Sequence, residues 1–481
     1  MSSVAPAELP AATGEPKEAQ LAPGLKKRHI SMISIAGVIG AGLFVGSSNA
    51  IAVAGPAVLI SYALAGTLVV LVMRMLGEMA VANPDTGSFS TYADRALGRW
   101  AGFSVGWLYW WFWVLVIPFE AIAAGEIIAG WTGLPAVLPT LLVIALLVAS
   151  NLISVKNYGE FEFWFALIKV VAIIAFIAMG VAAIFNLLPN QQSHGLAHLT
   201  SHGFMPAGVT AVATAMMTTM FSFMGTEIVT IAAAESKNPE AGITKATNSV
   251  IWRIGIFYIA SIFIVVALVP YTYFDKTTNP DGLGTYGAAL AAMGVTPEIA
   301  RNLVNVIVLF SVASCLNSAV YTASRMSFSL SRRGDAPAAW SRVTKQGVPA
   351  VSVLVSTAVA VVAVVLNYTG AQSIFSVLLQ TSGGIALLVY LVICFTQLAS
   401  RRRLEAEGRI GAVRMWGFPY VTIGTIVAII AICILMLTGS SRMDFVYSAI
   451  LAAITIAAGV VVQKRSGNRH GATDVTVPGG H

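Results

Sequence analysis

Charge is the property that this sequence has least of. Only 10% of its 481 residues are Asp, Glu, Lys or Arg, whereas 57% are hydrophobic. Soluble domains carry roughly 25% charged residues, because their surface must face water. A chain so poor in charge cannot cover a soluble globule of this length, so most of its surface must face lipid.

Cysteine and histidine are scarce too, and their placement excludes several kinds of site. The three cysteines lie inside apolar runs and are expected to pack as small hydrophobic residues, without disulfides. The histidines lack zinc-like spacing, and the apolar runs contain no Ser–His pairing and no nucleotide-binding loop. The sequence therefore predicts no metal site, no cofactor and no catalytic residue, and we do not expect an enzyme. The residues concerned are Cys315, Cys394, Cys433, His29, His194, His198, His202, His470 and His481.

The basic residues do not form a patch of the kind that binds nucleic acid. The formal net charge is +7, but Lys and Arg are scattered between apolar runs. Residues 1–24 contain no apolar core and no cleavable signal, and we expect a disordered cytoplasmic tail there and again at 466–481. Residues 25–465 are expected to form a single transmembrane domain.

About twelve apolar runs are long enough to cross a bilayer, which takes about 20 residues. We expect an all-α polytopic protein, with core helices at about 31–398 and two extra helices at about 417–463. The predicted spans are 31–53, 56–79, 103–130, 134–154, 161–186, 207–234, 250–271, 296–328, 350–367, 372–398, 417–438 and 444–463.

Lysine and arginine are concentrated in alternate connections between these spans. One set of connections carries nearly all of them, whereas the other set holds little more than Lys276, Arg301 and Arg442. Basic loops stay on the cytoplasmic side of a membrane. We therefore expect a multi-pass protein of the cell (plasma or inner) membrane with both termini in the cytoplasm and the loop 187–206 outside.

Span 1 contains a glycine-rich stretch that is expected to interrupt its helix. Three glycines, Gly37, Gly40 and Gly42, fall within six residues, and each weakens a helix by about 1 kcal/mol relative to Ala. Non-helical backbone at membrane depth is tolerated only where it lines a cavity or is buried in protein. The alternative is a face of small residues on which another helix packs closely.

Span 6 carries a second interruption, in the segment Phe221-Ser222-Phe223-Met224-Gly225-Thr226-Glu227. Spans 1 and 6 each open one half of a five-plus-five arrangement, and paired interrupted helices are typical of the substrate site of an inverted-repeat transporter. Amides freed at the start of a half-helix bind a carboxylate. Gly40, Ala41 and Gly42 would let a ligand reach them, while Ser222 and Thr226 would accept hydrogen bonds from an ammonium group. The pair therefore predicts a seat for a small zwitterion.

Ionisable side chains deep in the membrane are costly, so each is a candidate for function. Glu227, Glu120 and Lys169 lie deep in spans 6, 3 and 5. The alternatives are structural ion pairs or, for Lys169, a side chain that reaches back to the membrane surface. Glu126 lies nearer the outer end of span 3, and we expect it to reach the surface. Arg74 and Glu78 are expected to form an i,i+4 ion pair.

The sequence resembles the amino-acid permeases of the amino acid–polyamine–organocation superfamily, and within it the bacterial 4-aminobutyrate (GABA) permeases. The resemblance covers about residues 25–465. It is carried by GVIGAGLFVGS (37–47), GWLYWWFWVLVIPFEA (106–121), SVKNYGEFEFWFALIKV (154–170), FSFMGTEIVTIAAAESKNP (221–239) and SCLNSAVYTASRMSFSLSRRGDAP (314–337).

The resemblance implies a leucine-transporter-type five-plus-five inverted repeat and secondary active transport by alternating access. It implies that the substrate carboxylate binds at Ile39, Gly40, Ala41 and Gly42, and the amine near Phe221, Ser222 and Gly225. It also implies proton coupling through Lys169, which matches the position where sodium-coupled relatives bind a sodium ion, so no bound sodium is expected. Glu120 and Glu227 match acidic positions that line the substrate or proton path in similar proteins.

We therefore expect import of a small amino acid, GABA in particular, by proton symport. Open alternatives are an exchanger of amino compounds and a proton-coupled permease for β-alanine or an α-amino acid. A channel would show repeated polar rings along a pore, and only two interrupted spans are present. The oligomeric state is left open.

Overall fold

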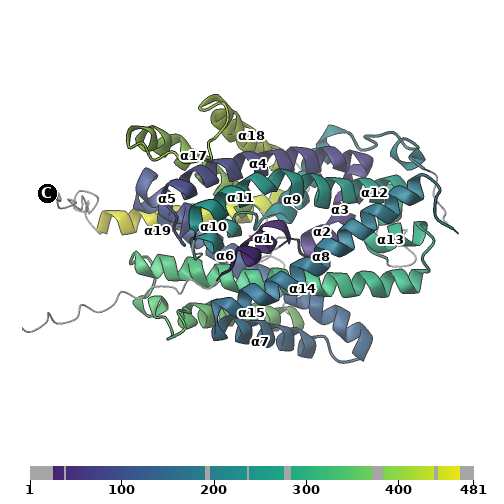
Figure 1. Cartoon of the computed structure of the whole chain (residues 1–481), viewed down its shortest axis with the longest axis horizontal. Helices are drawn as coiled ribbons and strands as arrows, with labels where there is room; N and C mark the ends of the chain where they lie inside the picture. The colour runs from purple at the N-terminus through teal and green to yellow at the C-terminus, as the bar shows by residue number, and fades with distance from the viewer. Residues whose placement is uncertain are drawn as a thin grey trace, which may run out of the picture.

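The structure of the protein is a computed structural model, which describes residues 25–36, 39–189, 195–235, 238–275, 283–370, 382, 384–437 and 442–465. Its long helices run side by side along one axis, with α7 and α15 along one edge and α17 and α18 along the other (Figure 1). Within the described residues, nine helical segments are long and apolar enough to cross a membrane, and α7 and α18 are apolar but shorter.

Each of the twelve predicted spans contains one of these helices or a set of consecutive helices. In the described part of the chain, nine spans hold a single α-helix: α4 (Val58–Ala82), α6 (Arg99–Thr132), α7 (Val137–Ile153), α8 (Val155–Ile184), α14 (Pro297–Arg332), α15 (Ala350–Tyr368), α17 (Ile385–Ala406), α18 (Tyr420–Met436) and α19 (Arg442–Arg465). The first part of the tenth predicted span, 372–381, lies outside the described residues.

The other three spans are segmented. Span 1 consists of α1 (Lys27–Ala36), α2 (Ala41–Phe44) and α3 (Gly46–Ala54), and span 6 consists of α9 (Gly208–Phe223) and α10 (Ile228–Ala234). Span 7 consists of α11 (Pro239–Arg253), a π-helical segment (Ile254–Ala260) and α12 (Ser261–Leu268). Short helices outside the spans are α5 (Ser88–Leu97), α13 (Thr285–Ala292) and four 3₁₀ turns at Gly55–Ala57, Ala197–Leu199, Tyr271–Phe274 and Ala338–Ser341.

The ends of several helices follow from local sequence. Ser154 caps α8, since its hydroxyl accepts a hydrogen bond from the Asn157 amide at 3.1 Å. Gly133 ends α6 in the left-handed conformation, with φ of 71°. Pro297 begins α14 and Pro239 begins α11, where a missing amide proton costs nothing. The first helix of span 7 therefore begins at Pro239, earlier than the predicted residue 250. The prediction followed the apolar run, and the first turns of α11 are polar.

Helix α14 lies at the centre of the bundle and packs extensively on α6, α8 and α15. Its inner part is rich in small residues, with Ser311, Ser314, Ser318 and Ala319 all buried. Small side chains let neighbouring helices approach closely and place hydroxyl groups between them. This helix therefore carries both close packing and polar contacts into the middle of the protein.

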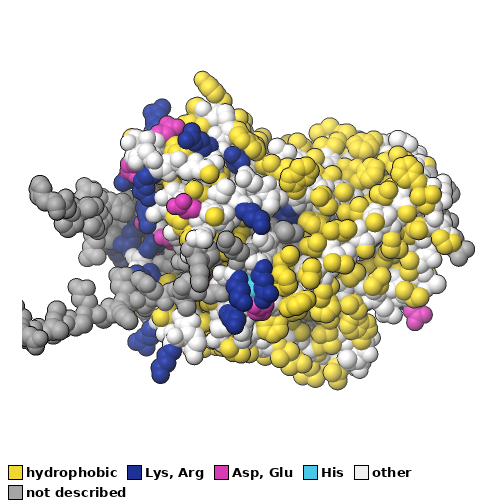
Figure 2. Space-filling model, viewed as in Figure 1, with side chains coloured by type: hydrophobic (Ala, Val, Ile, Leu, Met, Phe, Trp, Pro, Cys, Tyr) yellow, Lys and Arg dark blue, Asp and Glu magenta, His cyan; other side chains and the backbone are white. Residues whose placement is uncertain are grey.

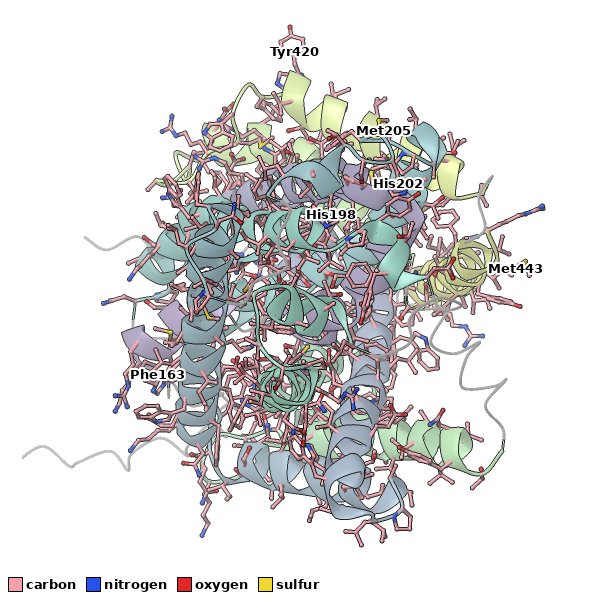
Figure 3. All side chains as sticks on the ribbon, turned by 90° about the vertical axis from the view of Figure 1, so that its right-hand side faces the viewer. Phe163, His198, His202, Met205, Tyr420 and Met443 are labelled. Atoms are coloured by element: carbon pink, nitrogen blue, oxygen red, sulfur yellow. The ribbon has the colours of Figure 1, made fainter. Side chains whose placement is uncertain are left out.

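Lys and Arg side chains gather at one end of the bundle, which we call the charged end (Figure 2). The opposite end carries residues 195–207, which precede α9, and His198, His202 and Met205 lie there (Figure 3). The one-sided distribution predicted from the connections is thus present in the folded chain. Beside the cluster of basic residues, hydrophobic side chains dominate the face shown in Figure 2.

The predicted ion pair between Arg74 and Glu78 was wrong. The carboxylate of Glu78 is fully buried, and it binds Arg401, the Gln397 amide group and the backbone amide of Met415. The guanidinium group of Arg74 instead stacks on the Trp416 ring, 4.0 Å from its centre. Glu78 pairs with Arg401, 323 residues away in sequence, because this pair lies inside the protein, where solvent screens an ion pair less.

Candidate functional site

The helix of span 1 is interrupted in its middle. Helix α1 ends at Ala36, Gly37 and Val38 lie outside the described residues, and Ile39 and Gly40 are not helical before α2 begins. The Gly40 carbonyl accepts hydrogen bonds from the amides of Leu43 and Phe44 at 3.2 and 3.5 Å. The Ile39 carbonyl receives a side-chain donor instead, as described below, so the interruption exposes backbone groups to other partners.

Span 6 is interrupted at the predicted place, between Phe223 and Ile228. Gly225 adopts a φ of +102°, a conformation that side-chain-bearing residues rarely adopt. The Glu227 carboxylate folds back onto the break and accepts hydrogen bonds from the Gly225 amide at 3.0 and 3.1 Å. It also accepts hydrogen bonds from the hydroxyls of Tyr109 (2.9 Å) and Tyr390 (3.4 Å). Glu227 therefore holds the break in shape and ties it to α6 and α17.

The two interruptions lie so close together that a side chain at two glycines of span 1 would crowd its neighbours. A Cβ atom on Gly42 would lie 3.0 Å from Ser222 Cα and 3.2 Å from its hydroxyl. A Cβ atom on Gly40 would lie 2.7 Å from Glu120 Oε1 and 2.8 Å from Cys315 Cβ. Spans 1, 3, 6 and 8 thus converge on these two glycines.

A small cavity lies at this convergence. Its polar wall combines the backbone of the two glycines with Glu120, Ser222 and Cys315. Its apolar wall is made of Phe112, Trp113, Val116, Phe221 and Met224. A mostly apolar pocket with a few convergent polar groups is the usual form of a small-molecule site.

Residues 29–468, which include all of the residues around the cavity, match a family model described as "Amino acid permease". The chain belongs to the amino acid permease family. The permease is 55% identical over 455 residues to the probable GABA permease of Pseudomonas aeruginosa, with 93% of this chain and 94% of the relative covered. It is 54% identical over 451 residues to the gamma-aminobutyric acid permease of Escherichia coli K12, with 93% and 95% covered. The prediction of an amino acid transporter rather than an enzyme is thereby confirmed.

The permease also resembles solved transporter structures. A mutant of the manganese transporter of Eremococcus coleocola superposes with a TM-score of 0.56, covering 92% of this chain and 93% of the other, at 13% sequence identity. This likeness concerns the fold alone. Together with the two interrupted helices, it confirms the predicted all-α, polytopic fold class.

Lys169 of the permease is fully buried and binds the backbone at the interruption of span 1. Its ammonium group donates to the Ile39 carbonyl at 3.0 Å and to the Ser314 hydroxyl at 2.9 Å. The Ser314 hydroxyl in turn donates to Glu162 Oε1 at 2.6 Å. Lys169 therefore does not reach back to the membrane surface, and that alternative was wrong.

Glu162 is a buried acid that the sequence analysis did not single out. It is fully buried on α8, seven residues before Lys169. Because seven residues make nearly two turns, both side chains leave the same face of the helix. This spacing was the signal that could have found it. Glu126, in contrast, is exposed, as its place near the end of α6 predicted.

The predicted substrate residues fall into two groups. Gly40, Gly42, Phe221 and Ser222 line the cavity, together with Glu120. The others lie around it. Ile39 is buried behind the break, Gly225 packs against the Trp113 ring, the Thr226 hydroxyl donates to the Phe223 carbonyl at 2.7 Å, and the side chain of Ala41 lies outside the described residues.

Sequence reasoning did not identify Phe112, Trp113, Val116, Met224 or Cys315 as cavity residues. Phe112 and Trp113 belong to an aromatic run in α6, in which composition alone cannot distinguish rings that face lipid from rings that face the site. In the structure the Phe221 ring lies edge-on to Phe119 at 5.7 Å and near Phe112 at 6.0 Å. The rings of Phe112 and Phe221 line the apolar side of the cavity, and Phe119 packs behind Phe221.

Proposed function

We propose that this permease imports GABA together with a proton by alternating access, with its charged end in the cytoplasm of a bacterial inner membrane. The observation that carries the proposal is the cavity between two interrupted helices, in a chain that is 55% and 54% identical to proteins named GABA permeases. Basic residues at one end of the bundle support the orientation, since they stay on the cytoplasmic side.

The substrate would lie between the two breaks. Its carboxylate would bind backbone amides in the Ile39–Gly42 segment, and its ammonium group would extend toward Ser222 and the carbonyls around Gly225 and Thr226. GABA separates its charges by more bonds than an α-amino acid does, so the two polar regions must lie further apart. Phe221 and the rings of α6 would cover the methylene groups between them.

Glu120 lies close to where the substrate carboxylate would bind. Its Oε1 is only 2.7 Å from the position that a Cβ atom on Gly40 would take. Two carboxylates repel each other when they share a site of low dielectric. We therefore assign Glu120 the uptake of a proton as substrate binds, which would link the two ligands. Glu227 is instead assigned to holding the break in span 6, because two tyrosines and a backbone amide already bind it.

Substrate and coupling can be tested in proteoliposomes with labelled GABA. We expect uphill uptake when a proton gradient is imposed and loss of accumulation with an uncoupler. Unlabelled GABA should compete with labelled GABA more strongly than β-alanine or α-amino acids do. An exchanger would behave differently: it would show counterflow of internal and external substrate but no accumulation driven by protons. No sodium dependence is expected.

Glu120→Gln is expected to weaken the pH dependence of GABA affinity. Linked binding of two ligands typically changes affinity by about 5- to 150-fold. In wild type the apparent affinity for GABA should fall by about 5- to 150-fold from acidic to alkaline pH. In the Gln variant, which has no carboxylate to protonate, the affinity should change little with pH. Binding to detergent-purified protein at several pH values measures this.

Glu126→Gln is the matched control, because it removes an exposed carboxylate from the same helix. It should retain the wild-type pH profile. A Glu120→Gln protein with that same profile would show that Glu120 does not bind the coupled proton.

A further inference from the structure

The charged groups around Lys169 form a connected line of polar contacts on one face of α8 and α14. Glu120 lies beside Gly40 and Cys315, while Lys169 binds Ile39 and Ser314, each one residue earlier in the same two segments. The carboxylate in the cavity wall and the buried ammonium group are therefore neighbours. The line then continues away from the cavity, from Lys169 through Ser314 to Glu162.

The hydrogen bonds along this line have a defined direction. Lys169 donates to the Ser314 hydroxyl, and this hydroxyl donates to Glu162 Oε1. Within the described residues, the second oxygen, Oε2, is buried and accepts no hydrogen bond. Asn317 and Ser318 lie near the same carboxylate, and the Asn317 side chain is fixed by a hydrogen bond from Asn151 at 2.8 Å.

Glu162 also lies nearer the charged end than Lys169 does. Two residues before it, Glu160 is partly exposed and pairs with Arg28 at that end. Between Glu162 and the charged end, Tyr158 stacks on Tyr321 with ring centres 4.1 Å apart, and the Tyr158 hydroxyl lies 3.4 Å from Ser318. Beyond the stacked rings, Arg325 forms a buried ion pair with Glu235 at 2.9 Å.

We propose that Glu162 is the group that receives the transported proton from Lys169, through the hydroxyl of Ser314. This inference rests on the proton symport proposed above and adds the path by which the proton leaves the coupling site. The titratable groups that face this line are Glu120, Cys315, Tyr158, Tyr321, Arg325 and Glu235.

The transfer conserves atoms and charge. The Lys169 ammonium group gives one proton to Ser314 Oγ while the Ser314 hydroxyl gives its own proton to Glu162 Oε1, leaving a neutral amine and a neutral acid. The amine then takes the proton that entered with the substrate at Glu120. Glu162 releases its proton toward the charged end, and the pair returns to ammonium and carboxylate. One proton has crossed the site.

Two variants test this path in proteoliposomes. Glu162→Gln removes the acceptor and Ser314→Ala removes the bridge, and both keep Lys169 and the cavity side chains. In each, we expect the GABA accumulation ratio under a proton gradient to fall to about one. A transport cycle that moves no proton gains no free energy from the proton gradient. Exchange of internal for external GABA should survive, and proton uptake on GABA addition, followed with a pH-sensitive dye, should disappear.

Glu298→Gln is the matched control, since it removes an exposed carboxylate from the first turn of α14 and should accumulate GABA as wild type does. Uphill accumulation in both Glu162→Gln and Ser314→Ala would overturn the inference. Loss of exchange together with accumulation would also overturn it, since that result marks a structural role. A wild-type protein that does not accumulate GABA under a proton gradient would instead contradict the proposed symport.

Discussion

Replacing Gly42 with leucine is expected to abolish high-affinity substrate binding. The new Cβ atom would lie 3.0 Å from Ser222 Cα, 3.2 Å from Ser222 Oγ and 3.4 Å from Phe221 Cδ1, and the rest of the leucine would enter the cavity. Overpacking typically costs about 1–3 kcal/mol. Because about 1.4 kcal/mol corresponds to a factor of ten, the apparent affinity for GABA should fall by about 5- to 150-fold.

Gly424→Leu is the matched control for this change. Gly424 lies in α18 with no atom within 4 Å of its added Cβ, so the same substitution there meets open space. Equilibrium binding of labelled GABA to purified protein, alongside thermal unfolding of both variants, separates a blocked site from a misfolded protein. Unchanged affinity in the Gly42 variant would mean that the substrate binds elsewhere.

The positions of the two interruptions could be predicted from sequence because their causes are local. Glycines at Gly37, Gly40 and Gly42 weaken one helix, and the polar Ser222 and Glu227 mark the other within otherwise apolar runs. Each signal lies within a few residues of the feature that it produces. The same holds for the helix ends set by Pro297 and Gly133.

Partners that are distant in sequence could not be predicted in this way. Glu78 is bound by Arg401 although Arg74 lies only one turn away, because the bundle brings α17 against α4. The function of Glu227 was also incompletely predicted, since its hydrogen bonds to Tyr109 and Tyr390 come from two other helices. Such contacts depend on how helices pack, which no local pattern records.

Lys169→Met is expected to uncouple transport from protons. Methionine is close to lysine in length and fills most of the same space, so it limits the cost of an empty cavity. It cannot donate to the Ile39 carbonyl or the Ser314 hydroxyl, and it cannot carry a proton. We expect the GABA accumulation ratio under a proton gradient to fall to about one, while exchange without a gradient persists at a reduced rate.

Lys156→Met provides the control on the same helix, because Lys156 is exposed in the first turn of α8. It removes the same charge without touching the interruption of span 1, so its accumulation should match that of wild type. If Lys169→Met still accumulates GABA against its gradient, Lys169 is not the coupling group. In that case its role would be structural. Lys169 would donate a hydrogen bond to the Ile39 carbonyl, which the interrupted helix leaves without an amide partner, and Ser314 would hold the ammonium group in place.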